Sequence, residues 1–439
     1  MPAGRRSRSS GPPPPSKTLV LDNGAHTLKG GFSTDASPRV VPNCLARDRH
    51  RRVYVGSELS QCKDFSEIQF RRPVDKGFIV NWEAQSAIWD SEIISERGLG
   101  CDPSETRLIL AEPPNGLPAL QANCDQMVFE EFQFASYYRA IGPTLNAYND
   151  IQSYFQTPHD SRAQSPAEVA LVVDSGYSHT TVTPLLRGRP LHSAVRRLDI
   201  GGKFLTNYLT RLLSLRHFDM RNDVYIVNDL KEAASYVSLD FEADLEKTWK
   251  GTKGERREAF LTGGGIAKDY VLPDFQTRMK GELREFDPAA HSKSRKLAAG
   301  AAQEDVITLR NERFAVPELL FHPADVGLLQ SGLPNLIMRS VSGLPLGLWP
   351  GLLANVVVVG GNARIPGFRE RLQRELVGLA PDDCVVRVAV PGDPVTATWE
   401  GGARLAHHAD VEGLCVTRAE YEEYGAGWVA RKFAAGLPV

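Results

Sequence analysis

The chain has 439 residues, of which 42% are hydrophobic and 24% are charged, and its formal net charge is -2. A chain of this length exceeds what one hydrophobic core usually serves, so we expect two or more lobes. The small net charge argues against a nucleic-acid surface that covers the whole molecule. No apolar run approaches the length of a membrane span, and no apolar core follows the N-terminal arginines, so the sequence predicts a soluble protein that is not secreted.

Cysteine content and the N-terminal segment give two further expectations. Six cysteines, at positions 44, 62, 101, 124, 384 and 415, form no close pair with metal-ligand spacing, so we expect reduced thiols in the cytosol or nucleus. Residues 1–16 combine arginines with a run of prolines and predict a disordered basic tail. A role of these arginines in nuclear import or DNA contact stays open beside a plain solvated tail.

One short motif occurs twice, first at 19–32 and again from Leu171. Each copy has an apolar run, then aspartate, a polar residue and glycine, and then a second extended run. This pattern predicts a β-hairpin with a tight glycine turn. Backbone amides in such a turn can hold a phosphate, and the aspartate can hold a hydrated divalent cation. Either copy alone would be an ordinary hairpin, but two copies favour a duplicated fold with a cleft between its halves.

The remaining segments predict alternating strands and helices. We expect a short strand at 53–55, a helix that begins near Trp82, and a buried strand at 108–111 that prolines stop. The proline after Gly142 either ends the preceding element or begins a new helix, because proline fits only the first helical turn. In the second half, the valine-rich strand before Gly360 and Gly361 runs into a glycine pair that suits close approach of a ligand.

The stretch 273–305 has the composition of an insertion, with many charged and small residues. In its first half, apolar residues recur at spacings of four, four and three, which predicts a short amphipathic helix: Phe275, Met279, Leu283 and Phe286. An apolar stripe that the core does not need is a candidate docking element for another subunit. The alternative is a solvated loop without a partner. The second half, 289–304, is expected to be disordered.

From about residue 18 to residue 431 the chain resembles actin and the actin-related proteins. Separated motifs occur in the family's order: the two hairpins, the segment 72–82, Asn311-Glu312-Arg313-Phe314, the strand before Gly360-Gly361, and Glu420-Tyr421-Glu422-Glu423. The resemblance implies a two-lobed α/β fold, with ATP or ADP and Mg in the cleft between duplicated lobes. It divides the chain into a first lobe at 17–164 and 398–439 with a reduced outer subdomain at about 44–72, and a second lobe at 165–397 with an outer subdomain at about 201–328.

The resemblance also implies a set of nucleotide-binding residues. Those expected to meet the phosphates and the cation are Asp22, Asn23, Gly24, Lys29, Asp174, Ser175 and Gly176. Those expected to hold the nucleoside are Gly202, Lys231, Glu232, Gly360 and Gly361. Asp22 and Asp174 would hold the metal through water. Lys29 has a local rationale as well, since an ammonium on the returning strand can neutralise phosphate charge.

The chain departs from the family pattern at both hairpin turns. Ala25 and the bulky His26 follow the first Asn-Gly, where the family has a small residue and a glycine. A hydroxyl contact to the terminal phosphate is therefore lost. In the second turn Tyr177 replaces an acidic residue and Ser178 replaces a glycine, which removes a carboxylate and narrows the turn.

Two further departures concern catalysis and the adenine pocket. Gly142 falls where actin has the glutamine that orients the attacking water, and Val395 where a lysine usually lines the adenine pocket. Phosphoryl transfer to water depends on positioning, and losing an orienting group typically costs about 10²–10⁴-fold. We therefore expect no catalytic residues and no efficient ATPase, with nucleotide binding retained or the cleft empty.

Within the family, the chain is most similar to the nuclear class of actin-related proteins. That class implies a non-catalytic scaffold subunit of a Swr/SRCAP-type chromatin-remodelling complex, which exchanges a histone variant into nucleosomes. The implied partners are a Snf2-type ATPase and a small zinc-finger subunit, with nucleosome contact through the complex. The implied location is the nucleus, with the cytoplasm as an additional location. No membrane contact and no filament are expected.

Two alternatives belong to other functional classes. A polymerising, ATP-hydrolysing actin-like protein needs a long subunit-contacting loop, and the segment 39–72 is too short to hold it. A metabolic kinase of the wider superfamily needs a carboxylate base beside the terminal phosphate, and Tyr177 and Gly142 offer none.

Overall fold

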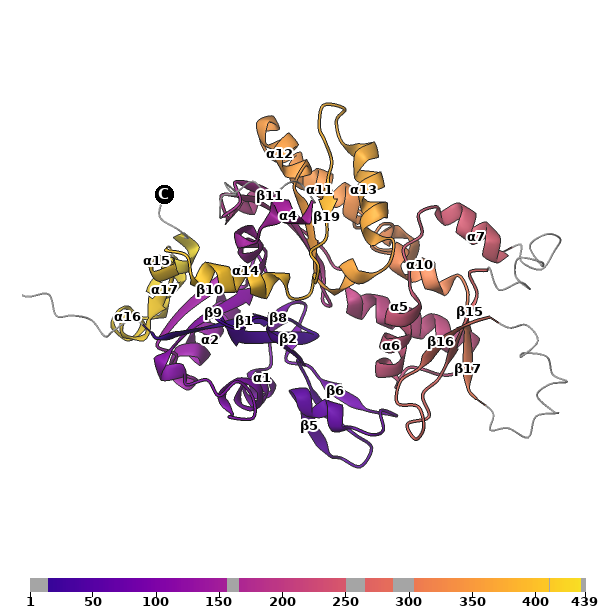
Figure 1. Cartoon of the computed structure of the whole chain (residues 1–439), viewed down its shortest axis with the longest axis horizontal. Helices are drawn as coiled ribbons and strands as arrows, with labels where there is room; N and C mark the ends of the chain where they lie inside the picture. The colour runs from indigo at the N-terminus through magenta and orange to yellow at the C-terminus, as the bar shows by residue number, and fades with distance from the viewer. Residues whose placement is uncertain (1–14, 156–165, 250–264, 287–303, 410, 436–439) are drawn as a thin grey trace, which may run out of the picture.

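The computed structural model describes residues 15–155, 166–249, 265–286, 304–409 and 411–435. Two large β-sheets, each with helices packed against it, form the centres of two lobes (Figure 1). Both sheets repeat one arrangement, in which an antiparallel hairpin lies beside a parallel strand that comes later in the chain. The α/β fold with duplicated lobes is therefore confirmed. The expected tail lies outside the described residues except for Pro15 and Ser16.

The sheet of the first lobe has the strand order β20-β10-β9-β1-β2-β3. Its strands are β1 (Lys17–Asn23), β2 (Thr27–Phe32), β3 (Arg39–Pro42), β9 (Thr106–Glu112), β10 (Ser136–Ile141) and β20 (Val416–Thr417). The predicted first hairpin is β1 and β2. Leu19, Val20 and Leu21 on β1 are all fully buried, because helices cover both faces of this sheet.

Helices from both ends of the chain cover the first sheet. They are α1 (Trp82–Trp89), α2 (Pro118–Gln126), α3 (Gly142–Leu145), α14 (Ala397–Ala406), α15 (Val411–Leu414), α16 (Arg418–Tyr424) and α17 (Ala426–Ala435). The short helix α4 (Ile151–Tyr154) packs instead against the sheet of the second lobe. Helix α14 returns to the first lobe, where Trp399 Nε1 donates a hydrogen bond to the Val20 carbonyl at 3.1 Å. As predicted, Pro143 lies in the first turn of a helix.

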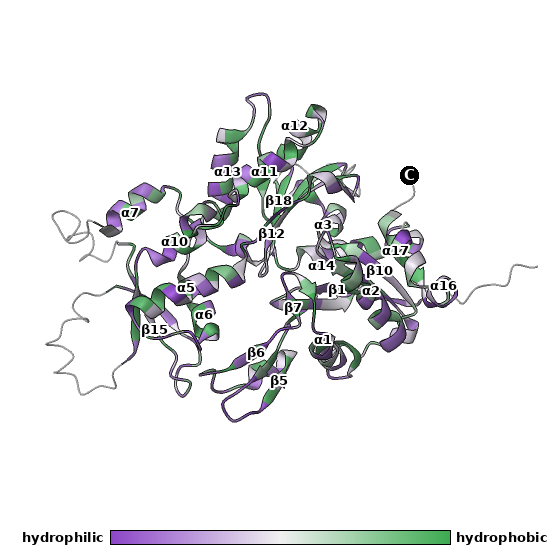
Figure 2. Ribbon diagram, turned by 180° about the vertical axis from the view of Figure 1, so that it is seen from behind, coloured by the Kyte–Doolittle hydropathy of each residue, from purple (hydrophilic) through white to green (hydrophobic). Residues whose placement is uncertain are grey.

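The sheet of the second lobe has the order β13-β12-β11-β18-β19, and β14 pairs with β12. Its strands are β11 (Val169–Ser175), β12 (Thr180–Leu186), β13 (Arg189–Pro190), β14 (Arg196–Leu198), β18 (Val356–Val359) and β19 (Val388–Ala389). The four valines of β18 are buried, and the strand stands out as apolar in Figure 2. The helices of this lobe are α5 (Gly202–Arg216), α6 (Val224–Ala234), α7 (Phe241–Trp249), α10 (Glu312–Glu318), α11 (Leu333–Val341), α12 (Trp349–Leu353) and α13 (Phe368–Leu379).

A small three-stranded sheet lies at the outer end of the first lobe. It consists of β4 (Leu45–Arg47), β5 (Val53–Val55) and β6 (Gln69–Arg71), and β5 coincides with the predicted strand. A two-stranded hairpin, β7 (Val74–Asp75) and β8 (Phe78–Ile79), follows it. Phe65 stacks on Tyr225 of the second lobe with ring centroids 4.0 Å apart. This aromatic contact joins the small sheet to the second lobe.

The helix predicted in the first half of the insertion is wrong. The chain there forms β16 (Glu282–Glu285), which pairs with β15 (Lys268–Val271), and β17 (Val306–Leu309) lies on the other side of β15. Asp274 accepts backbone hydrogen bonds that close a tight turn, and Phe275 has a positive φ of 54°. Pairing with β15 then places Leu283 opposite Tyr270, so tertiary contact overrides the local helical spacing. Residues 287–303 lie outside the described residues.

Two findings concern the chemistry of the whole chain. All six cysteines are free thiols, as predicted from their spacing. Among the helices of the described residues, none combines the length and the apolar character that crossing a membrane requires.

Candidate functional site

A cavity of about 500 Å³ lies between the two hairpin turns, and we call it the inner cavity. Strands β1 and β2 supply one wall, the β11–β12 turn supplies the opposite wall, and α6 and the end of β18 close one end. The structure brings together here all the predicted nucleotide-binding residues except Ser175: Asp22, Asn23, Gly24, Lys29, Asp174, Gly176, Gly202, Lys231, Glu232, Gly360 and Gly361. The repeated motif therefore places both of its turns on one cavity.

Ser175 has a different position from the one predicted. Its side chain is fully buried behind the turn, where its Oγ lies 2.9 Å from Thr180 Oγ1 and accepts a hydrogen bond from Asn362 Nδ2 at 3.1 Å. Asn362 also donates to the Gly176 carbonyl at 3.0 Å. These bonds fix the shape of the second turn, and the Ser175 hydroxyl does not line the inner cavity.

In the first turn, the side chains of Asp22 and Asn23 have different surroundings. Lys29 Nζ lies 3.1 Å from Asp22 Oδ2, because β1 and β2 pair these residues in register. Asn23 donates to Gln85 Oε1 at 2.9 Å, and its oxygen accepts a hydrogen bond from Trp89 Nε1 at 3.1 Å. The Asn23 side chain thus anchors the turn to α1, while Lys29 and Asp22 face the cavity.

Sequence reasoning missed two residues that support this turn. Asn43 Nδ2 donates to the Gly24 carbonyl at 2.9 Å, and Gln85 Nε2 donates to Asn43 Oδ1 at 3.2 Å. Both amides are fully buried. Buried amides are retained where hydrogen bonds satisfy them, but the sequence gives no sign that these two meet.

Asp174 on β11 is the most perturbed carboxylate of the inner cavity. Its pKa is raised to about 7, mainly by burial and also by the neighbouring Asp22 charge, while Lys29 acts in the opposite direction. Gly360 packs against this residue with φ at +92°, and a Cβ there would lie 2.9 Å from Asp174 Oδ1 and 2.4 Å from the Ser175 carbonyl oxygen. Only glycine suits this position, because the backbone is left-handed and the approach is close.

Lys231 and Glu232 on α6 line the inner cavity, together with residues after β18. The Lys231 ammonium contacts the Gly202 carbonyl at 3.3 Å, Thr206 Oγ1 at 3.0 Å and Asn228 Oδ1 at 3.0 Å. Burial lowers the pKa of Lys231 to about 8, while Glu232 opposes the shift. The Lys231 ammonium thus donates its hydrogen bonds to acceptors within the protein.

Two rings meet at the hairpin tips. The centroids of His26 and Tyr177 are 4.7 Å apart, although the rings come from different lobes. Arg72 Nη1 donates to the His26 carbonyl at 3.2 Å, and its guanidinium lies 5.1 Å from the Tyr177 centroid. Burial lowers the pKa of His26 to about 3, with smaller effects from Arg72, Lys231 and Lys29. The imidazole is therefore neutral at physiological pH.

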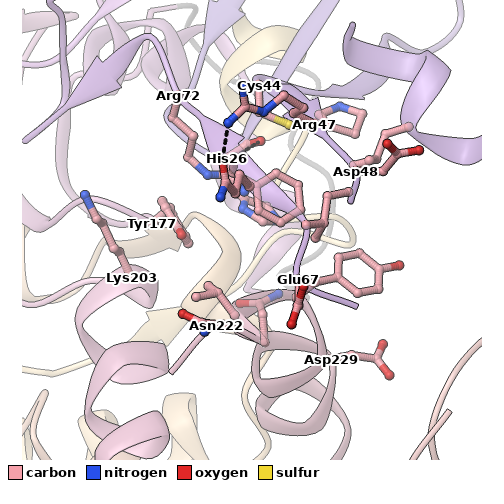
Figure 3. A pocket seen from close by; sticks show the side chains of 18 of the residues that line it. His26, Cys44, Arg47, Asp48, Glu67, Arg72, Tyr177, Lys203, Asn222 and Asp229 are labelled. Carbon is pink, nitrogen blue, oxygen red and sulfur yellow. Dashed lines mark hydrogen bonds between the residues drawn. The ribbon is translucent and has the colours of Figure 1, made fainter. Parts of the chain in front are cut away.

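A second cavity, of about 1220 Å³, lies beyond these rings, and we call it the outer cavity. Figure 3 shows His26 and Arg72 on its first-lobe side, and Tyr177 and Lys203 on its second-lobe side. Lys203 Nζ lies 3.4 Å from Asp75 Oδ1 and makes a further contact between the lobes.

The inner cavity fits a nucleotide with a hydrated cation. Its volume lies within the range of small-molecule sites, which is about 300–1,000 Å³. Lys29 and the exposed turn amides suit phosphate, and Asp22 and Asp174 suit a hard cation. Among the described residues no cluster of three or more His, Cys, Asp or Glu side chains could hold a metal ion. Any cation would therefore need water and phosphate oxygens as further ligands.

Gly142 begins α3 and lines the same cavity. A Cβ added there would meet the Glu112 carbonyl oxygen at 3.5 Å and Thr398 Cγ2 at 3.7 Å, both ordinary contacts. The position therefore has room for a side chain and carries none. Val395 also lines the cavity and brings no charge to it.

Comparison with known proteins agrees with the fold. A family model described as actin matches residues 14–434. Actin-related protein 6 of Neurospora crassa is 63% identical over 438 residues, 99% of this chain and 98% of that protein. Actin-like protein arp6 of Aspergillus fumigatus is 48% identical and covers 96% of both chains. Actin-related protein 6 of Drosophila melanogaster is 36% identical over 93% of this chain and 97% of that protein.

The two lobes, the paired hairpins and the full-length match define an actin-type protein, and the chain belongs to the actin family. Within the family, it is similar over almost its entire length to the actin-related protein 6 of fungi and fly.

Proposed function

We propose that this protein binds a Mg-nucleotide in the inner cavity without hydrolysing it efficiently, and serves as a scaffold subunit of a Swr/SRCAP-type chromatin-remodelling complex. Nucleotide binding is inferred from one observation: Asp22, Lys29 and Asp174 line the same cavity as the two glycine turns. The lack of hydrolysis rests on Gly142, which lines that cavity without a side chain to orient water.

The nucleotide-bound state has a structural role in this proposal. A ligand in the inner cavity contacts both hairpins and α6, and so it joins the two lobes. Binding to the folded state alone stabilises it by about 2.7 kcal/mol at a hundredfold excess over the dissociation constant. The bound nucleotide then supports one relative position of the lobes, which a scaffold presents to its partners.

The complex role is supported by the similarity to actin-related protein 6 and by the resemblance to the nuclear class of the family. The packing of the small outer sheet supports the proposal that the protein forms no filament. The core of this sheet packs against the second lobe through Phe65 and Tyr225, which uses surface that would otherwise be free for another copy. A head-to-tail filament fails when one of its two faces is missing.

Affinity purification of the full-length protein from nuclei, with identification of bound proteins and nucleotide, tests this proposal. The expected partners are a Snf2-type ATPase and a small zinc-finger subunit, with ADP or ATP released on denaturation. Sedimentation in polymerising salt and Mg-ATP provides the second readout. Pelletable, ATP-dependent filaments would overturn the scaffold role, and purified protein that binds no nucleotide would overturn the assignment of the inner cavity.

A further inference from the structure

His26 and Tyr177 form the boundary between the inner and the outer cavity. Only four of the described residues line both cavities: His26, Thr27, Tyr177 and Glu232. The two ring centroids are 4.7 Å apart, so the rings contact each other across the gap between the hairpins. The ring pair is therefore part of the boundary between the two cavities.

Both rings are held from the outer side. Arg72 donates to the His26 carbonyl at 3.2 Å and places its guanidinium over the Tyr177 ring at 5.1 Å. Such a cation–π contact stabilises a ring in one orientation. Arg72 lines the outer cavity and not the inner cavity. The guanidinium, which is the side chain best suited to a phosphate, thus lies behind the rings.

Few positively charged side chains line the inner cavity. Among the described residues, the lysines and arginines that line the inner cavity are Lys29, Lys231 and Arg364. Arg364 pairs with Asp393 at 2.7 Å, and the Lys231 amine contacts protein acceptors. Lys29 remains for phosphate, and it already lies 3.1 Å from Asp22. A longer phosphate chain would add negative charge without meeting another cation.

We propose that the ring pair of His26 and Tyr177 makes the inner cavity selective for a nucleoside diphosphate over the triphosphate; this inference rests on the proposed nucleotide binding. A terminal phosphate held by Lys29 and the turn amides would lie beside the hairpin tips, where His26 and Tyr177 meet. A third phosphate must displace them and separate Tyr177 from Arg72. Specificity of this kind arises from a steric obstacle to the larger ligand, not from a better contact to the smaller one.

Calorimetric titration of the full-length protein, first stripped of nucleotide with a chelator, tests the selectivity. The probes are Mg-ADP and the Mg complex of adenylyl imidodiphosphate, a triphosphate that is not hydrolysed. Wild-type protein is expected to bind the diphosphate more tightly by about tenfold or more. His26→Ala and Tyr177→Ala should each reduce this preference to about threefold or less, mainly by tightening the triphosphate.

Two controls separate ring bulk from general loosening of the lobes. Tyr177→Phe keeps the ring and should keep the preference. Asp75→Ala removes the ion pair with Lys203 between the lobes but lies outside the inner cavity, and it should also keep the preference. Equal affinity for both probes in the wild type would overturn the inference and leave nucleotide binding intact. Equal loss of preference in Asp75→Ala would overturn it as well, whereas binding of neither probe would overturn the proposed function itself.

Discussion

Asp22 and Lys29 face each other across the first hairpin, and the lysine Nζ lies 3.1 Å from the aspartate Oδ2. Asp174 holds the equivalent place in the second hairpin, but its partner in register is Thr181. Of the two aspartates in the repeated motif, Asp22 therefore has a cationic partner in its own hairpin and Asp174 has none. Burial raises the pKa of the second carboxyl to about 7. A bound cation at Asp174 would have to displace a proton near neutral pH.

Asp174→Asn tests whether this carboxylate holds the cation. The variant keeps the size of the side chain but removes its negative charge, so Mg-ADP should no longer stabilise the protein. The expected loss is about 2.7 kcal/mol of ligand-dependent stabilisation at a hundredfold excess of ligand over the wild-type dissociation constant. Thermal melting with and without Mg-ADP measures it. Asp382→Asn, at an exposed site away from both cavities, is the matched control and should behave as wild type. An unchanged melting shift in Asp174→Asn would place the site elsewhere.

Mg-ADP affinity should rise with pH through the pKa of Asp174, which is about 7. Below this value the carboxyl is protonated, and cation binding must release the proton, so affinity falls by about tenfold per pH unit. Above it the carboxylate is already charged and the affinity levels off. Calorimetry at pH 6, 7 and 8 measures the profile. The nucleotide's own phosphate also titrates, so Mg binding by ADP alone at the same pH values serves as the baseline. A protein profile that is flat after this correction would contradict the assignment.

Gly142→Gln tests the missing water-orienting group. The cavity wall accepts a Cβ at this position with contacts of 3.5 Å or more, so the variant should fold. An amide aimed into the cavity can orient water, and an orienting group typically contributes about 10²–10⁴-fold. We therefore expect at least the lower end of that range as a gain in ATP turnover, measured by phosphate release. Gly142→Ala adds the Cβ without the amide and should show no gain. Wild-type turnover as fast as that of filamentous actin would refute the role assigned to this glycine.

Gly77→Ala should destabilise the protein, because Gly77 connects β7 and β8 against the second lobe. Its φ is +93°, and a Cβ would lie 2.3 Å from His179 Cε1. Left-handed backbone and a steric clash together cost about 1–3 kcal/mol. Chemical denaturation of both proteins measures the difference. Gly392→Ala, where no atom lies within 4 Å of the added Cβ, should change stability by less than about 0.5 kcal/mol. Equal effects of the two substitutions would show that the β7–β8 hairpin is not held against His179.

Local sequence patterns were sufficient for the hairpins and the buried strands. In each hairpin, an apolar run, a glycine turn and a returning strand lie within about fifteen residues, and β-hairpins form from such local signals. The repetition at Leu171 then indicated two lobes, because a duplicated motif tends to build a duplicated fold. The insertion shows the limit of this reasoning. The apolar residues do recur at helical spacing there, but the segment pairs with the edge of β15. A local pattern cannot reveal that such an edge is available.

The sequence by itself determined which residue types stand at the two turns: the aspartates, the glycines, Lys29 and the bulky His26 and Tyr177. Only the tertiary structure decided that these two rings meet between the lobes, that Arg72 lies behind them, and that the Ser175 hydroxyl points away from the cavity. The physical reason is distance along the chain. Turn geometry follows from neighbouring residues, whereas a contact between lobes depends on the packing of both sheets, which no short segment encodes.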